Sequence, residues 1–415
     1  MGVGLATVAV AAILVLTLAP DSDRPLGEHF CLICGTFGGV DAVLNVLLFM
    51  PLGLGLAVAG TSPRRAILSM AVLSALIELA QLLVVPGRDA TIGDLLTNSI
   101  GGALGFVLGL RFSGLIFPTP RKAATYATSW AAVWVGAQSV FSYGFAPALP
   151  RSHYYGQLAR RLGHFEQFHG KVLSATVGNV RVPDTRLEDS DRVRLLLEAG
   201  APLAAVFTPA KVSSGIAPIV RIADNAQREI ALLAQTPEGF VYGVRTGADV
   251  LALRRPFFVL IPGASNRADL SAATSPISVV SQYSPPASRI TIRIGAATIS
   301  RDIDLSASLG WTMLLPFQWF VGGTAMEQLI SAVWLASLLM PLGYWTSCAS
   351  RGRKKSLPAV VAMLLALMSL GLVFIPSTFG LGVSPPGDWG SAVIGLLVGC
   401  WAASTIARWK AESSG

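Results

Sequence analysis

The sequence predicts a polytopic α-helical membrane bundle with an inserted extracytoplasmic antiparallel β-sandwich of the jelly-roll type. Of its 415 residues, 53% are hydrophobic and only 13% are charged, and the mean hydropathy is +0.60. Eight apolar runs approach the roughly 20 residues that a helix needs to cross a bilayer. A stretch of about 160 residues between the fifth and sixth runs instead alternates in the way typical of strands. This composition excludes an ordinary soluble globular protein.

Each apolar run is expected to form one membrane-spanning helix. The first could instead be a cleaved signal peptide, since Pro20 and an acidic segment follow it. It has no Lys or Arg before its apolar part, which favours a retained helix. The predicted spans are about 3–19, 42–60, 66–85, 91–110, 124–145, 325–346, 357–375 and 389–407.

The basic loops predict the orientation. With eight spans, the loops that hold most Lys and Arg all fall on one side, which is the cytoplasmic side by the positive-inside rule. Both termini are then cytoplasmic, and residues of about 147–310 lie outside the cytoplasm. The net charge of +8 largely reflects these loops, and no basic patch with interleaved aromatic residues indicates nucleic acid. The basic residues are Arg64, Arg65, Arg111, Arg121, Lys122, Arg351, Arg353, Lys354, Lys355, Arg408 and Lys410.

Residues 147–310 contain short apolar segments separated by turn residues, the pattern of a sandwich or jelly roll. The following segment, 309–323, is rich in aromatic residues and suits a membrane interface. It either docks the β domain on the bilayer or is an early start of the sixth helix. The predicted strands are VRLLLEAG, PLAAVFTP, APIVRIAD, EIALLAQT, FVYGVRTG, FFVLIPG, ISVVSQY and RITIRIG.

Polar residues interrupt the second, third and fourth predicted helices. Carboxylates and amides in hydrocarbon are costly and indicate a site by default. Their depths predict one cluster in the outer half of the bilayer, with a basic residue at its mouth. The cluster is either a polar ligand pocket or a hydrogen-bond network that only holds the helices together, as nearby glycines also favour. Its members are Asn45, Glu78, Gln81, Asp94 and Asn98, with Arg88 at the mouth.

The pieces NVLLFMPLG (45–53), IELAQ (77–81) and GRDATIGDLLTNSIGGALG (87–105) resemble the VanZ-like membrane family over residues 1–112. The resemblance implies a polytopic bundle of the bacterial cell envelope. It is linked by name to glycopeptide-antibiotic resistance and has no settled biochemical activity. The positions that match the family motif are Asn45, Pro51, Glu78, Gln81, Arg88, Asp94 and Asn98.

The segment GIAPIVRIADNAQREIALLAQTPEGFVYGVRT (215–246) resembles concanavalin-type, laminin-G-like sandwiches, in which paired strands flank a tight turn. Sandwiches of this type often bind glycans without catalysis. The resemblance makes Asp224, Asn225, Tyr242 and Arg245 candidate ligand residues. The expected partners are membrane lipids and a glycan or lipid-linked precursor. The sequence identifies no protein partner.

Cys31 and Cys34 form a CxxC in the first outer loop, where a disulfide or two free thiols are the main alternatives. No His follows directly, as haem attachment requires, and too few ligands surround it for zinc. His153, His164 and His169 more plausibly pack at the base of the β domain than bind metal. We expect no metal and no cofactor.

The C-terminal helices echo the first block. MPLG occurs at 50–53 and at 340–343, and GDLLTNSIGGALG (93–105) aligns with GDWGSAVIGLLVG (387–399). This pattern suggests a duplicated three-helix unit in parallel orientation, with the sandwich inserted between the copies. In the second copy, Ala392 stands in place of Asn98. The first copy therefore carries the chemistry, if the two are related.

The predicted organisation is a VanZ-like bundle (1–112), a fifth helix (113–146), a lectin-like sandwich (147–310) and a C-terminal unit (311–415). The leading functional hypothesis is ligand binding in polysaccharide or cell-wall precursor handling or antibiotic resistance. One alternative is a membrane enzyme with Glu78 or Asp94 as acid and base. Another alternative is a structural scaffold.

Overall fold

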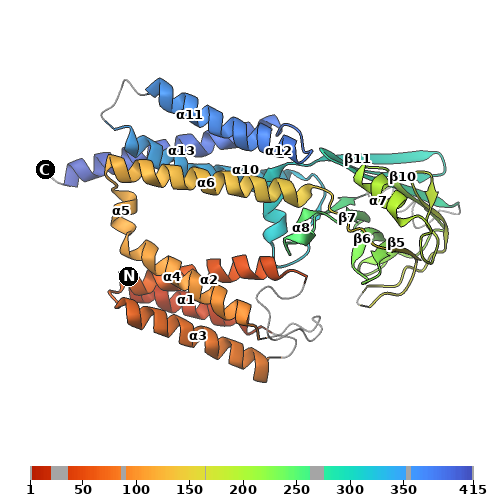
Figure 1. Cartoon of the computed structure of the whole chain (residues 1–415), viewed down its shortest axis with the longest axis horizontal. Helices are drawn as coiled ribbons and strands as arrows, with labels where there is room; N and C mark the ends of the chain where they lie inside the picture. The colour runs from red at the N-terminus through yellow and green to blue at the C-terminus, as the bar shows by residue number, and fades with distance from the viewer. Residues whose placement is uncertain are drawn as a thin grey trace.

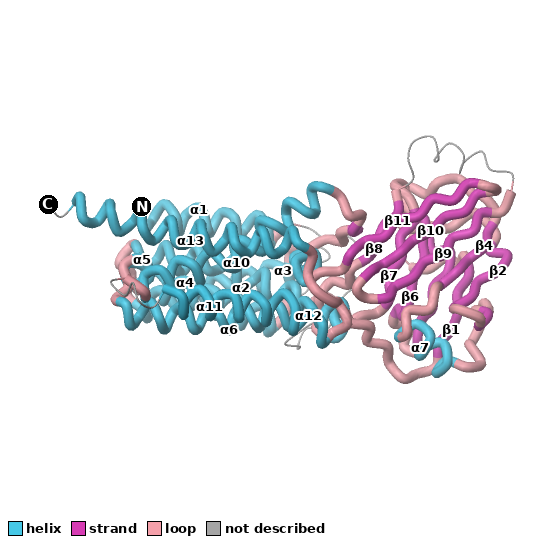
Figure 2. Tube along the Cα trace, turned by 90° about the horizontal axis from the view of Figure 1, so that it is seen from above, coloured by secondary structure: helices cyan, strands magenta, loops and turns pink. Residues whose placement is uncertain are grey.

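The computed structural model describes residues 2–19, 36–85, 90–163, 165–261, 275–351 and 357–413. The molecule is elongated, with the helices side by side along its long axis and the β domain at one end (Figure 1). Both termini lie at the opposite end, as Figure 2 also shows.

The helices form two groups in Figure 1. The N-terminal group holds α1 (Gly2–Thr17), α2 (Gly38–Val58), α3 (Pro63–Leu83) and α4 (Ile92–Leu110), and the short α5 (Phe112–Ile116) leads out of it. The second group holds α6 (Pro120–Phe145), α10 (Ala325–Ala349), α11 (Leu357–Ser369) and α13 (Pro386–Ser413). A π-helical turn, η3 (Leu370–Phe374), and α12 (Ile375–Thr378) extend α11.

Within the described part of the chain, six helices are long and apolar enough to cross a membrane: α2, α3, α4, α10, the segment Leu357–Thr378, and α13. This supports a multi-pass membrane protein. The other two predicted spans correspond to α1, which is apolar but has 16 residues, and to α6, which has 26 residues. The count of eight spans therefore stays a prediction.

Glycines bring α2 and α4 into close contact. A Cβ added at Gly101 or Gly105 would overlap the carbonyl oxygen of Val46 or Met50, so only glycine permits this approach. The same contact recurs between α10 and α13. There, a Cβ at Gly395 or Gly399 would overlap the carbonyl oxygen of Ala336 or Met340. The spacing is four residues on each helix of both pairs.

The described residues of the β domain form two six-stranded sheets. The first has the order β1-β5-β6-β7-β8-β12 and the second has the order β11-β10-β9-β4-β2-β3. All pairings are antiparallel except that of β12 with β8. The first sheet comprises Tyr154–Leu158, Ala217–Asp224, Glu229–Gln235, Phe240–Val244, Phe257–Leu260 and Phe320–Val321. The second, in chain order, comprises Val172–Val177, Val180–Arg181, Leu203–Phe207, Ile277–Ser284, Ala287–Ile294 and Ala297–Asp304.

The main hydrophobic core lies between the two sheets. Phe207 of the second sheet contacts Phe240 of the first, with ring centroids 5.8 Å apart, and Phe258 and Tyr283 approach to 5.7 Å. These buried aromatic contacts hold the sheets face to face. A helical membrane part with a predominantly antiparallel β domain is thus confirmed, while the jelly-roll connectivity stays a prediction.

One predicted strand is wrong. VRLLLEAG belongs to helix α7 (Ser190–Glu198), which covers part of the β domain. The side chain of Asp189 caps this helix by accepting a 2.9 Å hydrogen bond from Arg192 N. Val193 and Leu197, four residues apart, turn one face inward, and Gly200 follows the helix with a φ of +77°.

The segment 309–323 does not begin the sixth predicted span, so that alternative is wrong. It contains the end of η1 (Ala307–Leu314), a 3-10 helix, followed by β12, and α10 begins only at Ala325. Glu327 and Thr324 form a reciprocal capping box that fixes this start. Trp311 Nε1 donates to Ser331 Oγ at 3.0 Å and thereby attaches the segment to α10.

Hydrogen bonds join the β domain to both helix groups. Gly39 N of α2 donates to the carbonyl of Ala252 at 3.0 Å, and the Tyr283 hydroxyl donates to the carbonyl of Phe145 at the end of α6. Ser306, next to η1, donates from its hydroxyl to the carboxylate of Asp388 in α13. The starts of α2 and α13 therefore lie at the β-domain end of the bundle.

Candidate functional site

The centre of the predicted polar cluster lies where α2 faces α4. Asn45 Nδ2 donates to Asp94 Oδ1 at 2.7 Å and to Thr97 Oγ1 at 3.4 Å. The glycine contacts described above bring the backbones of α2 and α4 together close to this point and further along both helices. The structure thus joins two predicted site residues, Asn45 and Asp94, directly.

Glu78 joins this group from α3. Its Oε2 accepts a 2.9 Å hydrogen bond from Thr91 N, and the Thr91 hydroxyl in turn accepts from Asp94 N at 3.0 Å. Thr91 is the N-cap of α4. Two carboxylates therefore meet at the first turn of one helix, where its dipole favours negative charge.

Asn98 and Gln81 are buried nearby but make separate contacts. Asn98 Nδ2 donates to Ser74 Oγ at 3.0 Å and links α4 to α3, whereas Gln81 Nε2 donates to the carbonyl of Thr17 at 2.9 Å and links α3 to α1. Among the described residues, neither side-chain oxygen has a hydrogen-bond partner. Each keeps an acceptor available in a buried position.

All of these contacts lie in the half of the bundle nearest the β domain. They involve the first half of α2 and α4 and the last half of α1 and α3. Since α2 starts next to Ala252 of the β domain, this is the end at which the helices meet that domain (Figure 1).

Three predicted features lie outside the described residues: Arg88 at the mouth of the cluster, and Cys31 and Cys34, the disulfide candidates. His164 lies outside them as well. Within the parts that are described, no group of three His, Cys, Asp or Glu side chains is arranged to hold a metal ion.

The four candidate ligand residues of the β domain do not share one accessible surface. Asp224 is fully buried and accepts hydrogen bonds from the backbone of Ala226 and Arg228, which closes its own turn. Tyr242 is fully buried in the core, and burial raises the pKa of its phenol. Arg245 pairs with Asp249 at 3.8 Å, and only Asn225 is exposed.

A buried ion cluster in the β domain was not anticipated from the sequence. Arg255, only 7% exposed, contacts Asp249 Oδ1 at 2.7 Å and Glu229 Oε1 at 2.9 Å. Burial alone would lower the pKa of Arg255, but the two carboxylates outweigh it and raise the pKa. Asp249 and Arg255 are six residues apart, but Glu229 comes from the separate strand β6, so only the fold reveals the cluster.

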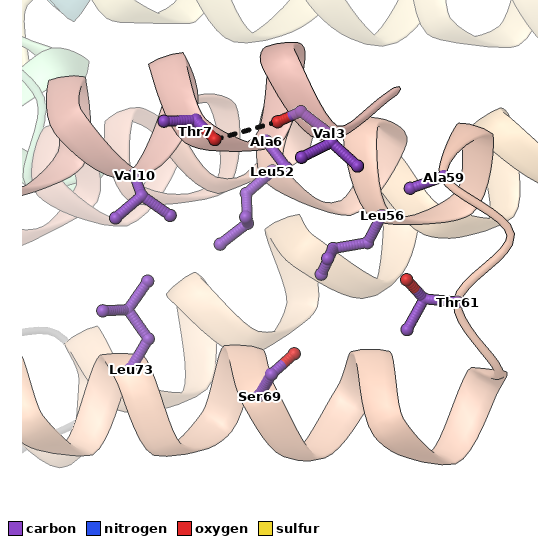
Figure 3. A pocket seen from close by; sticks show the side chains of 10 residues that line it. All are labelled: Val3, Ala6, Thr7, Val10, Leu52, Leu56, Ala59, Thr61, Ser69 and Leu73. Atoms are coloured by element: carbon purple, nitrogen blue, oxygen red, sulfur yellow. Dashed lines mark hydrogen bonds between the residues drawn. The ribbon is translucent and has the colours of Figure 1, made fainter. Parts of the chain in front are cut away.

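A cavity of about 500 Å³ lies between α1, α2 and α3. Figure 3 shows its mostly apolar lining and the hydrogen bond of 3.0 Å from Thr7 Oγ1 to the carbonyl of Val3. It lies at the end that carries the termini, and none of the predicted polar residues lines it. The polar cluster and this cavity are therefore separate features.

Comparisons with known proteins address the N-terminal group alone. No curated protein and no solved structure matches the chain. The model of the VanZ/LLP1 family matches residues 10–113, which include the second half of α1 and the whole of α2, α3 and α4. The same range contains the whole polar cluster. The helical segment formed by residues 10–113 is thus similar to the VanZ/LLP1 family.

Proposed function

We propose that this protein is a cell-envelope membrane protein whose VanZ-like helices bind a polar or lipid-linked ligand at the extracytoplasmic side. The ligand would contact the cluster formed by Asn45, Glu78 and Asp94, beside the β domain. A role in polysaccharide or cell-wall precursor handling, or in antibiotic resistance, fits such a site. The apolar helices and the match of residues 10–113 to the VanZ/LLP1 family support a VanZ-like membrane protein.

The distribution of basic residues supports the orientation. The described basic residues of the predicted cytoplasmic loops lie at the ends of helices remote from the β domain, on the side of both termini. By the positive-inside rule this side faces the cytoplasm. The β domain and the polar cluster would then face outward, if α1 and α6 also cross the membrane.

The observation that carries the proposal is the meeting of Glu78 and Asp94 at one helix start. Two carboxylates within a membrane bundle are costly to keep and by default indicate a functional site. Among the described residues, the buried side-chain oxygens of Asn98 and Gln81 accept no hydrogen bond and add further acceptors. A ligand with several hydroxyl or N–H donors, such as a sugar, would satisfy such groups.

The second helix pair argues against a purely structural role. When Gly101 and Gly105 are aligned with Gly395 and Gly399, Asn98 corresponds to Ala392. Aligning Met50 with Met340 likewise makes Asn45 correspond to Leu335. The pair α10–α13 thus packs with the same glycine contacts and without either amide. If the pairs arose by duplication, the amides of the first copy serve something other than packing.

A binding measurement tests the proposal. The purified full-length protein would be titrated with a polyprenyl-linked glycan and with the same glycan free in solution. Asp94→Asn and Glu78→Gln should each weaken binding at least tenfold. Asp388→Asn is the matched control at the equivalent position of α13, and it should bind normally. Equal binding by all three variants would contradict the proposal.

A membrane enzyme remains the second candidate, because paired carboxylates in a low-dielectric site suit acid and base roles. Incubation of the same lipid-linked glycan with the protein separates the two functions. Binding without any change in the glycan favours a binding protein. Cleavage or transfer that disappears in Glu78→Gln favours an enzyme.

A further inference from the structure

A second cavity, of about 790 Å³, lies between α10, α11 and α13 near the end of the bundle that carries both termini. This volume is in the range of roughly 300–1,000 Å³ typical of small-molecule sites. Apolar side chains of α11 and α13 form most of its walls. Two of them, Val361 and Leu397, are 46% and 62% exposed, so the cavity is open toward the surroundings of the helices.

One end of this cavity is polar and positively charged. Thr346 and Ser347 of the last turn of α10 line it, together with Ser350 and Arg351, which directly follow the helix. Arg351 donates one hydrogen bond to the carbonyl of Ala403 at 2.7 Å, out of five N–H groups that an arginine carries. Thr346 is only 4% exposed, and its hydroxyl has no partner among the described residues.

The sequence explains why the cavity exists in this helix group. In the N-terminal group, Gly102 lets α3 approach α4 so closely that a Cβ there would overlap Met70 Sδ. The alignment that pairs Gly101 with Gly395 places Leu396 at the position of Gly102. Leu396 lines the cavity. A branched side chain at this position keeps α11 away from α13 and leaves the space open.

We propose that this cavity binds an anionic glycerophospholipid from the leaflet on the side of the termini. An acyl chain would lie along Val361 and Leu397, and the phosphate would accept charge-assisted hydrogen bonds from Arg351. The hydroxyl of Thr346, which has no partner among the described residues, offers a further donor. This inference is independent of the proposed function, because the cavity lies on other helices and at the opposite end.

Native mass spectrometry of the full-length protein in detergent micelles tests the proposal. The protein would be offered phosphatidylglycerol or phosphatidylcholine with identical acyl chains, and it should retain more phosphatidylglycerol. Arg351→Gln should reduce this preference roughly fivefold, the factor that one basic side chain contributes at a membrane surface. Arg408→Gln is the matched control, since Arg408 is basic and exposed at the same end but does not line the cavity.

A second pair of variants tests the apolar part. Val361→Trp fills the cavity and should abolish retention of both lipids. Val398→Trp places the same side chain at a similarly exposed position of α13 outside the cavity and should leave retention unchanged. Unaltered retention in Val361→Trp, or an unaltered lipid preference in Arg351→Gln, would overturn the proposal. If Val361→Trp does not fold, the preference of Arg351→Gln for phosphatidylglycerol over phosphatidylcholine tests the proposal by itself.

Discussion

The amide of Asn45 in α2 donates a 2.7 Å hydrogen bond to the carboxylate of Asp94 in α4, across the interface that Gly101 and Gly105 make possible. The bond orients one oxygen of Asp94 at the start of α4, where Glu78 arrives from α3 through Thr91. Three helices thus present polar groups at one level. This relationship underlies both the proposed site and the first prediction.

The Asn45–Asp94 contact should contribute measurable stability. We expect a double-mutant cycle with Asn45→Ala and Asp94→Ala to give a coupling free energy of about 0.5–2 kcal/mol, the range found for hydrogen bonds between membrane helices. Unfolding of the four proteins in mixed detergent micelles would measure it. Additive effects of the two substitutions would show that the amide and the carboxylate do not interact.

Gly105 should not tolerate a side chain. Gly105→Val would push α4 away from the Met50 carbonyl, and we expect it to lower the free energy of unfolding by about 1–3 kcal/mol. Gly136→Val in α6 is the control, because a Cβ at Gly136 meets nothing within 4 Å. Thermal unfolding of both variants checks this, and equal midpoints would argue against the close helix contact.

Breaking the buried ion cluster should damage the β domain. Arg255→Ala removes the closest cation of Asp249 and Glu229, which keep only longer contacts to Arg245 (3.8 Å) and Arg221 (3.5 Å). Breaking a buried ion pair in this way typically costs about 3–5 kcal/mol. The exposed pair of Arg289 and Asp302, joined at 2.5 Å, offers a comparison. Arg289→Ala should change the unfolding temperature far less, since solvent screens that pair. An equally small loss in Arg255→Ala would contradict the cluster.

Two buried tyrosines should respond differently to loss of the hydroxyl. Tyr283 donates to the carbonyl of Phe145, so Tyr283→Phe should cost about 1 kcal/mol. The Tyr242 hydroxyl is buried without a partner among the described residues, so Tyr242→Phe should be neutral or stabilising. Thermal unfolding at neutral pH distinguishes the two outcomes, and a clear loss in Tyr242→Phe would reveal a bond to that hydroxyl.

Alkaline pH gives a second readout on these tyrosines. Burial raises the pKa of both phenols above the unfolded value of about 10. A group whose folded pKa is raised contributes full stability below its unfolded pKa and loses it as pH rises further. Stability should therefore fall above about pH 10. The fall should be shallower in Tyr242→Phe, because that variant has one such group fewer.

Regular features were predictable from the sequence. The apolar runs indicated the helices, and turn-bounded apolar segments indicated seven of the strands. The strand predicted at VRLLLEAG was wrong because a short apolar run fits either a strand or a helix. Here Asp189 caps the start of a helix and Gly200 follows its end. Strands β1 and β11 were not predicted from the sequence, because their residues are largely polar or small.

Depth along each helix predicted that Asn45, Glu78 and Asp94 lie close together, and the structure joins them through Thr91 and a direct hydrogen bond. That these residues form a ligand site stays a prediction. Depth did not reveal that Gln81 faces Thr17 of α1, because helix rotation depends on packing rather than on depth. In the β domain, the resemblance predicts Asp224 as a ligand residue, but its carboxylate accepts hydrogen bonds within its own turn. Polar residue type alone does not separate these roles.

The proposed ligand site requires the β domain and the polar cluster to lie on the same, extracytoplasmic side of the membrane. Labelling of intact cells with a membrane-impermeant thiol reagent tests this most directly, in a protein whose four native cysteines are replaced by alanine. Asn225→Cys in the β domain should be labelled from outside, and Arg408→Cys in α13 only after permeabilisation. Labelling of Arg408→Cys in intact cells, with Asn225→Cys protected, would contradict the account.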